Sequence, residues 1–144
     1  MCKSIEVGKH ILNFCIKNKY EITPSKIQKL LYYMQGYFYA KNNENMFDEK
    51  ILAWDCGPAI PEVNAYFTKY IHENKGEPIV ANLFLSDAEK EVFKFVCEKK
   101  SVLSTNELIE ITQKETPWVY VYKDGVGKND IITNEHLKKW FGGI

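Results

Sequence analysis

Apolar side chains recur at the helical period through much of this chain. In the clearest example, Thr23 suits the N-cap of a helix and Pro24 suits its first turn. Apolar residues then follow at spacings i, i+3, i+4, i+7 and i+11, namely Ile27, Leu30, Leu31, Met34 and Phe38. This spacing forms one apolar stripe along a helix. The pattern therefore predicts a helix that begins at Pro24, extends through Tyr39 and packs against the rest of the protein.

The other sides of this predicted helix are unusually aromatic. One side carries two glutamines and two tyrosines, Gln28, Tyr32, Gln35 and Tyr39. A third side carries Lys26, Lys29, Tyr33 and Tyr37. A helix that is apolar or aromatic all round is usually buried, with its hydroxyl groups bonded internally. Tyrosine and glutamine also suit a binding face. Both interpretations remain open, and they can hold for different sides of the helix.

Capping residues, prolines and short apolar runs predict the remaining elements. A first helix is expected from about Ser4 to Asn18, and later helix starts are expected at Pro61, Ser86, Ser104, Thr116 and Thr133. Lys50 to Trp54 and Asp130 to Ile132 suit two short strands that can pair, and Gly57-Pro58 suits a stiff turn. We predict a mainly α fold, a single compact helical domain spanning residues 1–144, with six or seven helices and a small two-stranded β element.

Composition narrows the class of protein further. A chain of 144 residues with 45% apolar content suits one domain. Residues 1–43 carry seven lysines and two acidic residues, whereas the remainder carries twelve lysines and seventeen acidic residues. The formal net charge is zero and arginine is absent, which disfavours sequence-specific DNA recognition. The basic N-terminal part is interpreted as solvated lysines or as a surface for an acidic partner.

The sequence contains no recognisable catalytic or metal-binding motif. Its four cysteines are too widely spaced for a CxxC pair, and its three histidines lack metal-ligand spacing. We find no phosphate-binding glycine loop and no nucleophile elbow. No secretory signal or long apolar run is present, so we expect reduced thiols in a cytoplasmic protein without a membrane span. We therefore expect no catalytic residue, metal or cofactor, and no enzyme activity.

Four segments together resemble the Panacea-domain (SocA-like) antitoxin family, which includes phage-associated proteins of formerly unknown function. They read IQKLLYYMQGY from Ile27, NMFDE from Asn45, AWDCGPAIP from Ala53 and TQKETPW from Thr112. A closing segment with Glu135 and the aromatic pair Trp140-Phe141 is also similar. The family pattern has a histidine where this chain has Gln113, so no role is transferred to that position.

The resemblance implies an antitoxin of a type II toxin–antitoxin system, which neutralises a co-encoded protein toxin by direct protein–protein binding. A protease adaptor and a small nucleic-acid-binding regulator are the alternatives. The candidate contact residues are Gln28, Tyr32, Gln35, Tyr39 and Trp54. Residues expected to maintain the fold are Leu30, Leu31, Gly57, Pro58, Pro61, Pro117 and Trp118.

Overall fold

The computed structural model describes residues 2–143, and within this range the protein is mainly α-helical, as predicted. The helices are α1 (Lys3–Lys17), α2 (Pro24–Asn42), α3 (Pro61–Asn74), α4 (Asp87–Lys100), α5 (Thr105–Thr112), α6 (Thr116–Tyr122) and α7 (Asn134–Phe141), with a 3-10 turn at Lys123–Gly125. The strands are β1 (Ile51–Trp54), β2 (Gly57–Ala59) and β3 (Ile131–Ile132). No helix among these is both long and apolar enough to cross a lipid bilayer.

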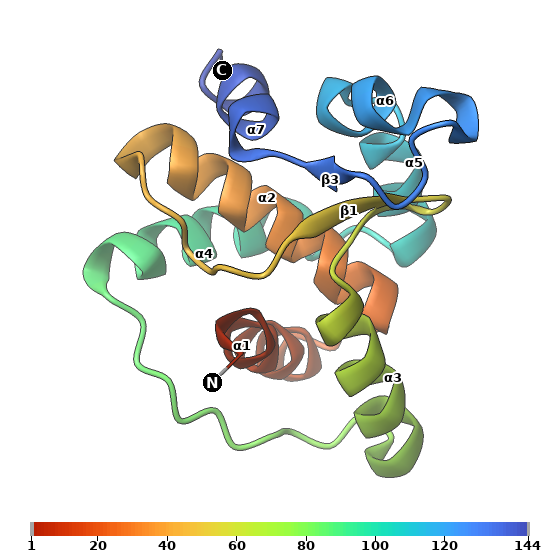
Figure 1. The fold of residues 1–144 in the computed structure, drawn as a ribbon. Coiled ribbons are helices and arrows are strands. Elements are labelled where there is room, and N and C mark those ends of the chain that lie inside the picture. The colour runs from red at the N-terminus through yellow and green to blue at the C-terminus, as the bar shows by residue number, and fades with distance from the viewer. Residues whose placement is uncertain (1, 144) are drawn as a thin grey trace.

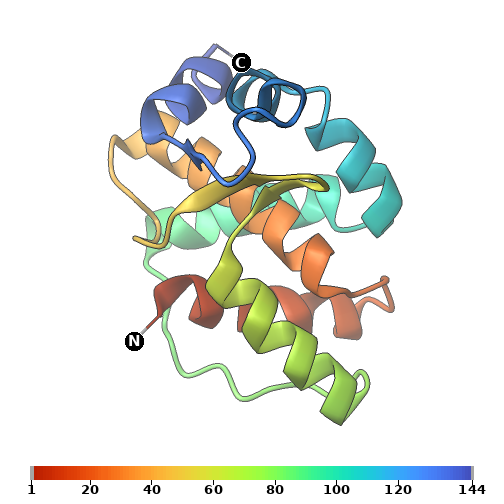
Figure 2. The ribbon, with the colours of Figure 1, turned by 45° about the vertical axis from the view of Figure 1, so that its right-hand side comes forward.

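Helix α2 passes through the middle of the molecule (Figures 1 and 2). It packs against α1, α3, α4, α5, α7 and β2, so that neighbours surround most of its circumference. The predicted apolar stripe from Ile27 to Phe38 is buried in this core. In Figure 1, α6, α7 and the sheet lie on one side of α2, and α1 and α3 lie on the other.

The predicted pairing of two short strands is confirmed, and a third strand is added. β1 pairs antiparallel with β3 through Ile51 and Ile132, and with β2 through Ala53 and Pro58. The expectation that Gly57-Pro58 is only a turn is wrong, because these residues continue as strand β2. Gly57 adopts a φ of +110°, which closes the tight hairpin from β1. Proline is tolerated at position 58 because β2 lies at the edge of the sheet.

Side-chain caps fix the beginnings of α2, α4, α5 and α7, as the sequence predicted. The Thr23 hydroxyl accepts a hydrogen bond from the backbone N–H of Lys26 at 3.1 Å. Ser86 and Ser104 both form complete capping boxes with the glutamate three residues later. Such caps satisfy N–H groups that the first helical turn leaves unpaired.

An extended segment between α3 and α4 runs along α1. The Asn13 side chain bonds both the N–H and the carbonyl of Ile79, at 2.9 and 2.7 Å. A ring nitrogen of His10 lies 2.7 Å from the carbonyl oxygen of Leu83. Alternate side chains point to solvent, and Phe84 is 94% exposed. This segment therefore places an exposed aromatic on the side of the protein away from α6 and α7 (Figure 1).

Candidate interaction surface

Gln28 of α2 holds the hairpin and the start of α3 in place. Its side-chain oxygen accepts the backbone N–H of Ile60, and its amide nitrogen donates to Pro24 O and Asn64 Oδ1, all at 3.0 Å. Ile60 is the N-cap residue of α3 and directly follows β2. The side chain is buried, and it makes three of the four hydrogen bonds available to an amide, all within the fold.

Gln35 holds the segment between α2 and β1 in place through hydrogen bonds to its backbone. Its Oε1 accepts the backbone N–H groups of Met46 and Phe47 at 2.8 and 3.3 Å, and its Nε2 donates to Phe47 O at 2.7 Å. Both Met46 and Phe47 are buried in the core. Buried backbone groups outside helices and strands need such partners. Gln35 therefore anchors the NMFDE segment to the central helix.

Two adjacent tyrosines of α2 bind one carboxylate. The hydroxyls of Tyr32 and Tyr33 donate to the two oxygens of Glu115 at 2.9 and 2.8 Å. Burial raises the pKa of Glu115, although the two hydroxyl donors oppose this rise. Burial near this carboxylate also raises the pKa of both tyrosines, so they remain protonated donors. The Lys100 ammonium lies 4.8 Å from the centre of the Tyr33 ring. Glu115 is the N-cap residue of α6, so this cluster fixes that helix on α2.

Two buried lysines of α2 donate to backbone carbonyl groups. The Lys29 ammonium donates to Pro58 O at 3.0 Å, and the Lys26 ammonium donates to Ser101 O at 2.5 Å. Burial lowers the pKa of Lys29 to about 8, and burial also lowers the pKa of Lys26. Both lysines therefore tie α2 to other segments, instead of contributing to a basic surface.

The side of α2 that was expected to bind a partner is largely buried within the protein. The side chains of Gln28, Tyr32 and Gln35 are at most 3% exposed, and each bonds to a partner within the protein. The expectation that they form an exposed surface is wrong, because α3, the hairpin and the segment before α6 cover that side of the helix. Tyr39 and Trp54 are half-buried, and their role as contact residues stays a prediction.

The residues expected to maintain the fold lie in or beside the core. Leu30, Leu31, Gly57, Pro58, Pro117 and Trp118 are buried, and Pro61 is half-buried. Trp118 donates its indole N–H to Trp54 O at 2.8 Å and stacks on Tyr122 at 4.3 Å. Gln113, at the position where the family pattern has histidine, donates to Asp55 O at 2.8 Å. The C-terminal motif is thus joined to the turn between β1 and β2.

Of the two aromatic residues at the end of α7, Phe141 lies in the core and Trp140 is only partly buried. Phe141 is buried among the rings of Tyr32, Tyr33 and Tyr37, with ring centres 5.5, 6.0 and 4.7 Å away. It packs directly over Gly36, where a methyl group would overlap its ring. The glycine therefore allows close packing of α7 on α2. Trp140 is only partly buried and faces the space beside α6.

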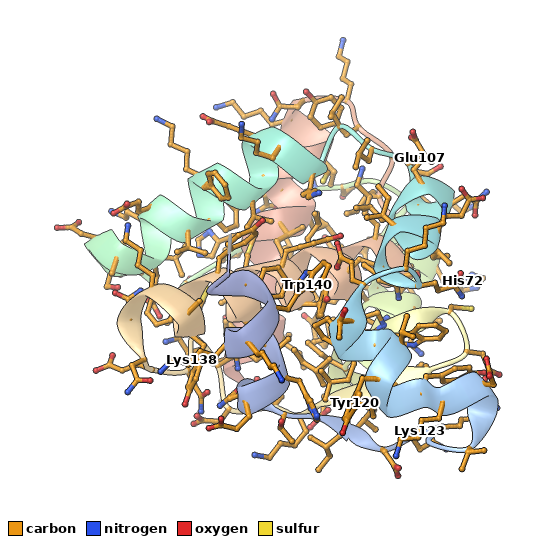
Figure 3. All side chains as sticks on the ribbon, turned by 90° about the horizontal axis from the view of Figure 1, so that it is seen from above. His72, Glu107, Tyr120, Lys123, Lys138 and Trp140 are labelled. Carbon is orange, nitrogen blue, oxygen red and sulfur yellow. The ribbon has the colours of Figure 1, made fainter. Side chains whose placement is uncertain are left out.

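A groove of about 760 Å³ lies between α6 and α7, lined by Thr116, Pro117, Tyr120, Glu135, His136, Lys138, Lys139 and Trp140. Figure 3 looks onto these two helices and shows Tyr120 and Trp140 on this face, with Lys123 near Tyr120. Tyr120 is 61% exposed, and its ring centre lies 5.3 Å from that of His136. The groove combines accessible aromatic rings with several charged side chains.

This groove was not predicted from the sequence. One signal for it was present, because all residues of α6 after Thr116 are apolar or aromatic, as its sequence TPWVYVY shows. A helix of seven residues packed on one side leaves some of these side chains in solvent. The groove itself depends on how α7 docks on α2, and that contact joins residues far apart in the chain.

The described part of the chain holds no group of three or more His, Cys, Asp or Glu side chains that could bind a metal ion. Cys15 and Cys97 are buried free thiols, and burial raises the pKa of both. The side chains that line the α6–α7 groove carry aromatic rings, hydroxyls, ammonium groups, one carboxylate and one imidazole. Such side chains are suited to recognising another molecule.

Comparison with known protein families matches residues 27–119 to the family described as antitoxin SocA-like, Panacea domain. The chain belongs to this family. The match begins within α2 and ends within α6, so it includes Gln28, Gln35 and Glu115, which link α2 to the other motif segments. No match was found among curated proteins or among solved structures.

Proposed function

We propose that this protein is the antitoxin of a type II system and neutralises a co-encoded protein toxin by binding it directly. The family match over residues 27–119 carries this proposal. The proposed mechanism needs no catalytic step, because a stoichiometric complex that covers the toxin's working surface is sufficient to block it. The antitoxin would then act by presenting a surface of the right shape and charge.

The geometry around α2 supports a division between scaffold and contact surface. The motif side chains of Gln28, Tyr32 and Gln35 use their polar atoms to hold the domain together. Accessible aromatic side chains lie elsewhere, including Tyr120 at the α6–α7 groove. Tyrosine and tryptophan are enriched among the residues that dominate protein–protein binding energy. A rigid scaffold that carries an aromatic groove suits direct binding of a protein.

The distribution of lysines favours a protein partner over nucleic acid. Two of the seven lysines in residues 1–43, Lys26 and Lys29, are buried. Three more, Lys3, Lys9 and Lys41, form ion pairs with glutamates. The basic N-terminal part of the sequence therefore leaves little uncompensated positive charge to neutralise phosphates.

Co-expression with the product of the adjacent open reading frame tests the proposal. We expect that product to arrest growth when expressed alone, and we expect growth to recover when this protein is present. Titration calorimetry with the two purified proteins should then show a saturable complex. A neighbour that is harmless alone, or that stays toxic in the presence of this protein, would contradict the proposal.

Two further experiments separate the proposal from the two alternatives. A protease adaptor should lose neutralisation in a host that lacks the protease, whereas direct binding should preserve it. A nucleic-acid-binding regulator should retain DNA or RNA at low salt and release it steeply as salt rises. Direct neutralisation requires neither behaviour.

A further inference from the structure

We propose that the α6–α7 groove binds an acidic segment of the toxin and seats one apolar side chain of that segment against Tyr120 and Trp140. This inference rests on the proposed function and adds the site and the chemistry of the partner. Three features carry it: the unburied apolar side chains of α6, the unpaired lysines around the groove, and the size of the hollow.

Helix α6 buries only part of its apolar surface. Pro117, Trp118 and Val121 point into the protein, whereas Val119 and Tyr120 are 47% and 61% exposed. Rigid aromatic rings at the surface lose little side-chain entropy on binding, and they therefore serve as anchors in interfaces. The outer side of α6 thus presents apolar area that the domain itself does not cover.

The charged groups around the groove favour an anionic partner. Lys138 and Lys139 line it together with Glu135, and the Lys123 ammonium lies 5.8 Å from the centre of the Tyr120 ring. None of these lysines forms an ion pair with another residue in the range 2–143. Lys138 donates to the neutral amide of Asn43, so its charge remains uncompensated. Among the side chains that line the groove, the two lysines outnumber the single glutamate, Glu135, and this excess of positive charge would attract a carboxylate.

The size of the hollow suits a short segment of chain. Its volume of about 760 Å³ lies within the roughly 300–1,000 Å³ typical of ligand pockets. A second hollow of about 400 Å³ lies between α2, α4 and α7. There Lys41 and Glu91 neutralise each other, so that hollow offers no net charge to a partner. The combination of apolar rings and unpaired positive charge favours the α6–α7 groove.

The small excess of positive charge at this groove suits a short acidic protein segment better than a polyanion such as nucleic acid. The cations that line it are lysines, which bind carboxylates and phosphates alike as point charges, so the amount of charge decides between the two partners. The overall formal charge of zero provides no long-range attraction for a polyanion. We therefore assign an acidic protein segment to the groove, and nucleic acid becomes an outcome of the test.

Binding of the purified product of the adjacent open reading frame tests this assignment. The dissociation constant is measured by calorimetry for Tyr120→Ala and Lys139→Glu. Phe84→Ala and Lys69→Glu are the matched controls, since they change an exposed aromatic and an exposed lysine on the other side of α2 (Figure 1). Thermal unfolding of each variant is recorded to establish that it is folded.

We expect Tyr120→Ala to weaken binding about tenfold or more, and Tyr120→Phe, which keeps the ring, to stay within about threefold of wild type. Lys139→Glu should weaken binding several-fold, with a deficit that shrinks as sodium chloride is raised. Both controls should bind within about twofold of wild type.

Each other outcome has a distinct meaning. If the wild-type protein does not bind the neighbouring product, the proposed function fails and this inference fails with it. If wild type binds and both groove variants bind equally well, the groove assignment alone is overturned. It is likewise overturned if Phe84→Ala has the larger effect, or if a single-stranded oligonucleotide competes with the partner for the groove at physiological salt.

Discussion

Lys29 gives a prediction about stability and pH. Its buried ammonium donates to Pro58 O at 3.0 Å, and burial lowers its pKa to about 8. A lysine in an unfolded chain has a pKa of about 10.4. Between these two values the unfolded chain holds a proton that the native protein has released. The free energy of unfolding contributed by Lys29 therefore rises as pH rises through this window.

The expected rise follows from the two pKa values. Between pH 7 and pH 9.5 the Lys29 contribution should increase by about 2 kcal/mol, at about 1.36 kcal/mol per pKa unit. The thiols of Cys15 and Cys97 act in the opposite direction, because burial raises the pKa of both in the native protein. The Lys29 term is therefore measured as a difference between wild type and Lys29→Met, since the thiols are common to both proteins.

Urea denaturation followed by tryptophan fluorescence provides the assay, with measurements in half-unit steps from pH 7 to pH 9.5. The free energy of unfolding of wild type minus that of Lys29→Met should rise by about 2 kcal/mol over this range. Lys69→Met is the control, because it makes the same substitution at an exposed lysine of α3. Parallel profiles for wild type and Lys29→Met would refute the reasoning.

Two further predictions concern packing and buried polar groups. Gly36→Ala should lower the free energy of unfolding by about 1–3 kcal/mol, because the added methyl group overlaps the ring of Phe141. In a double-mutant cycle measured by urea denaturation, Phe141→Leu should reduce that loss, whereas additive effects would contradict the predicted contact. Gln35→Leu should cost about 1–3 kcal/mol for each buried group left unpaired, since the N–H groups of Met46 and Phe47 lose their acceptor. Hydrogen exchange of residues 43–50 should accelerate, and unchanged exchange there would show that Gln35 does not hold the segment.

Local rules predicted the elements of this fold well. The Thr23 cap and the stripe from Ile27 to Phe38 involve residues within a few turns of one another, so the sequence pattern identifies them directly. Strand β2 was missed because its pairing depends on Gly57 adopting a positive φ, which a Gly-Pro pair allows without requiring it.

The exposure of the α2 side chains could not be predicted in the same way. The helical period shows that Gln28, Tyr32 and Gln35 share a side, but it does not show what covers that side. Their partners include Asn64 and Glu115, which are 36 and 83 residues away in the chain. Only the tertiary fold brings these groups together. The polar motif residues of α2 are therefore explained by their role in the fold. A contact surface is expected among exposed residues on other elements.

The α6–α7 groove follows from a similar long-range contact. It forms because Phe141 packs over Gly36 and brings α7 onto α2, while Glu115 fixes the start of α6 on the same helix. The motif residues of α2 thus position the groove without lining it. If the partner binds at the proposed groove, substitution of these buried residues should weaken binding by displacing α6 or α7.

Hydrogen–deuterium exchange of the protein, alone and in complex with the product of the adjacent open reading frame, tests the central claim most directly. The claim is that α2 is the scaffold and that the partner binds at α6 and α7. We predict slower exchange on complex formation in peptides covering Thr116–Tyr122 and Asn134–Phe141, with unchanged exchange in α1 and α3. Protection confined to α3 or to residues 79–85, with α6 and α7 unchanged, would contradict the account.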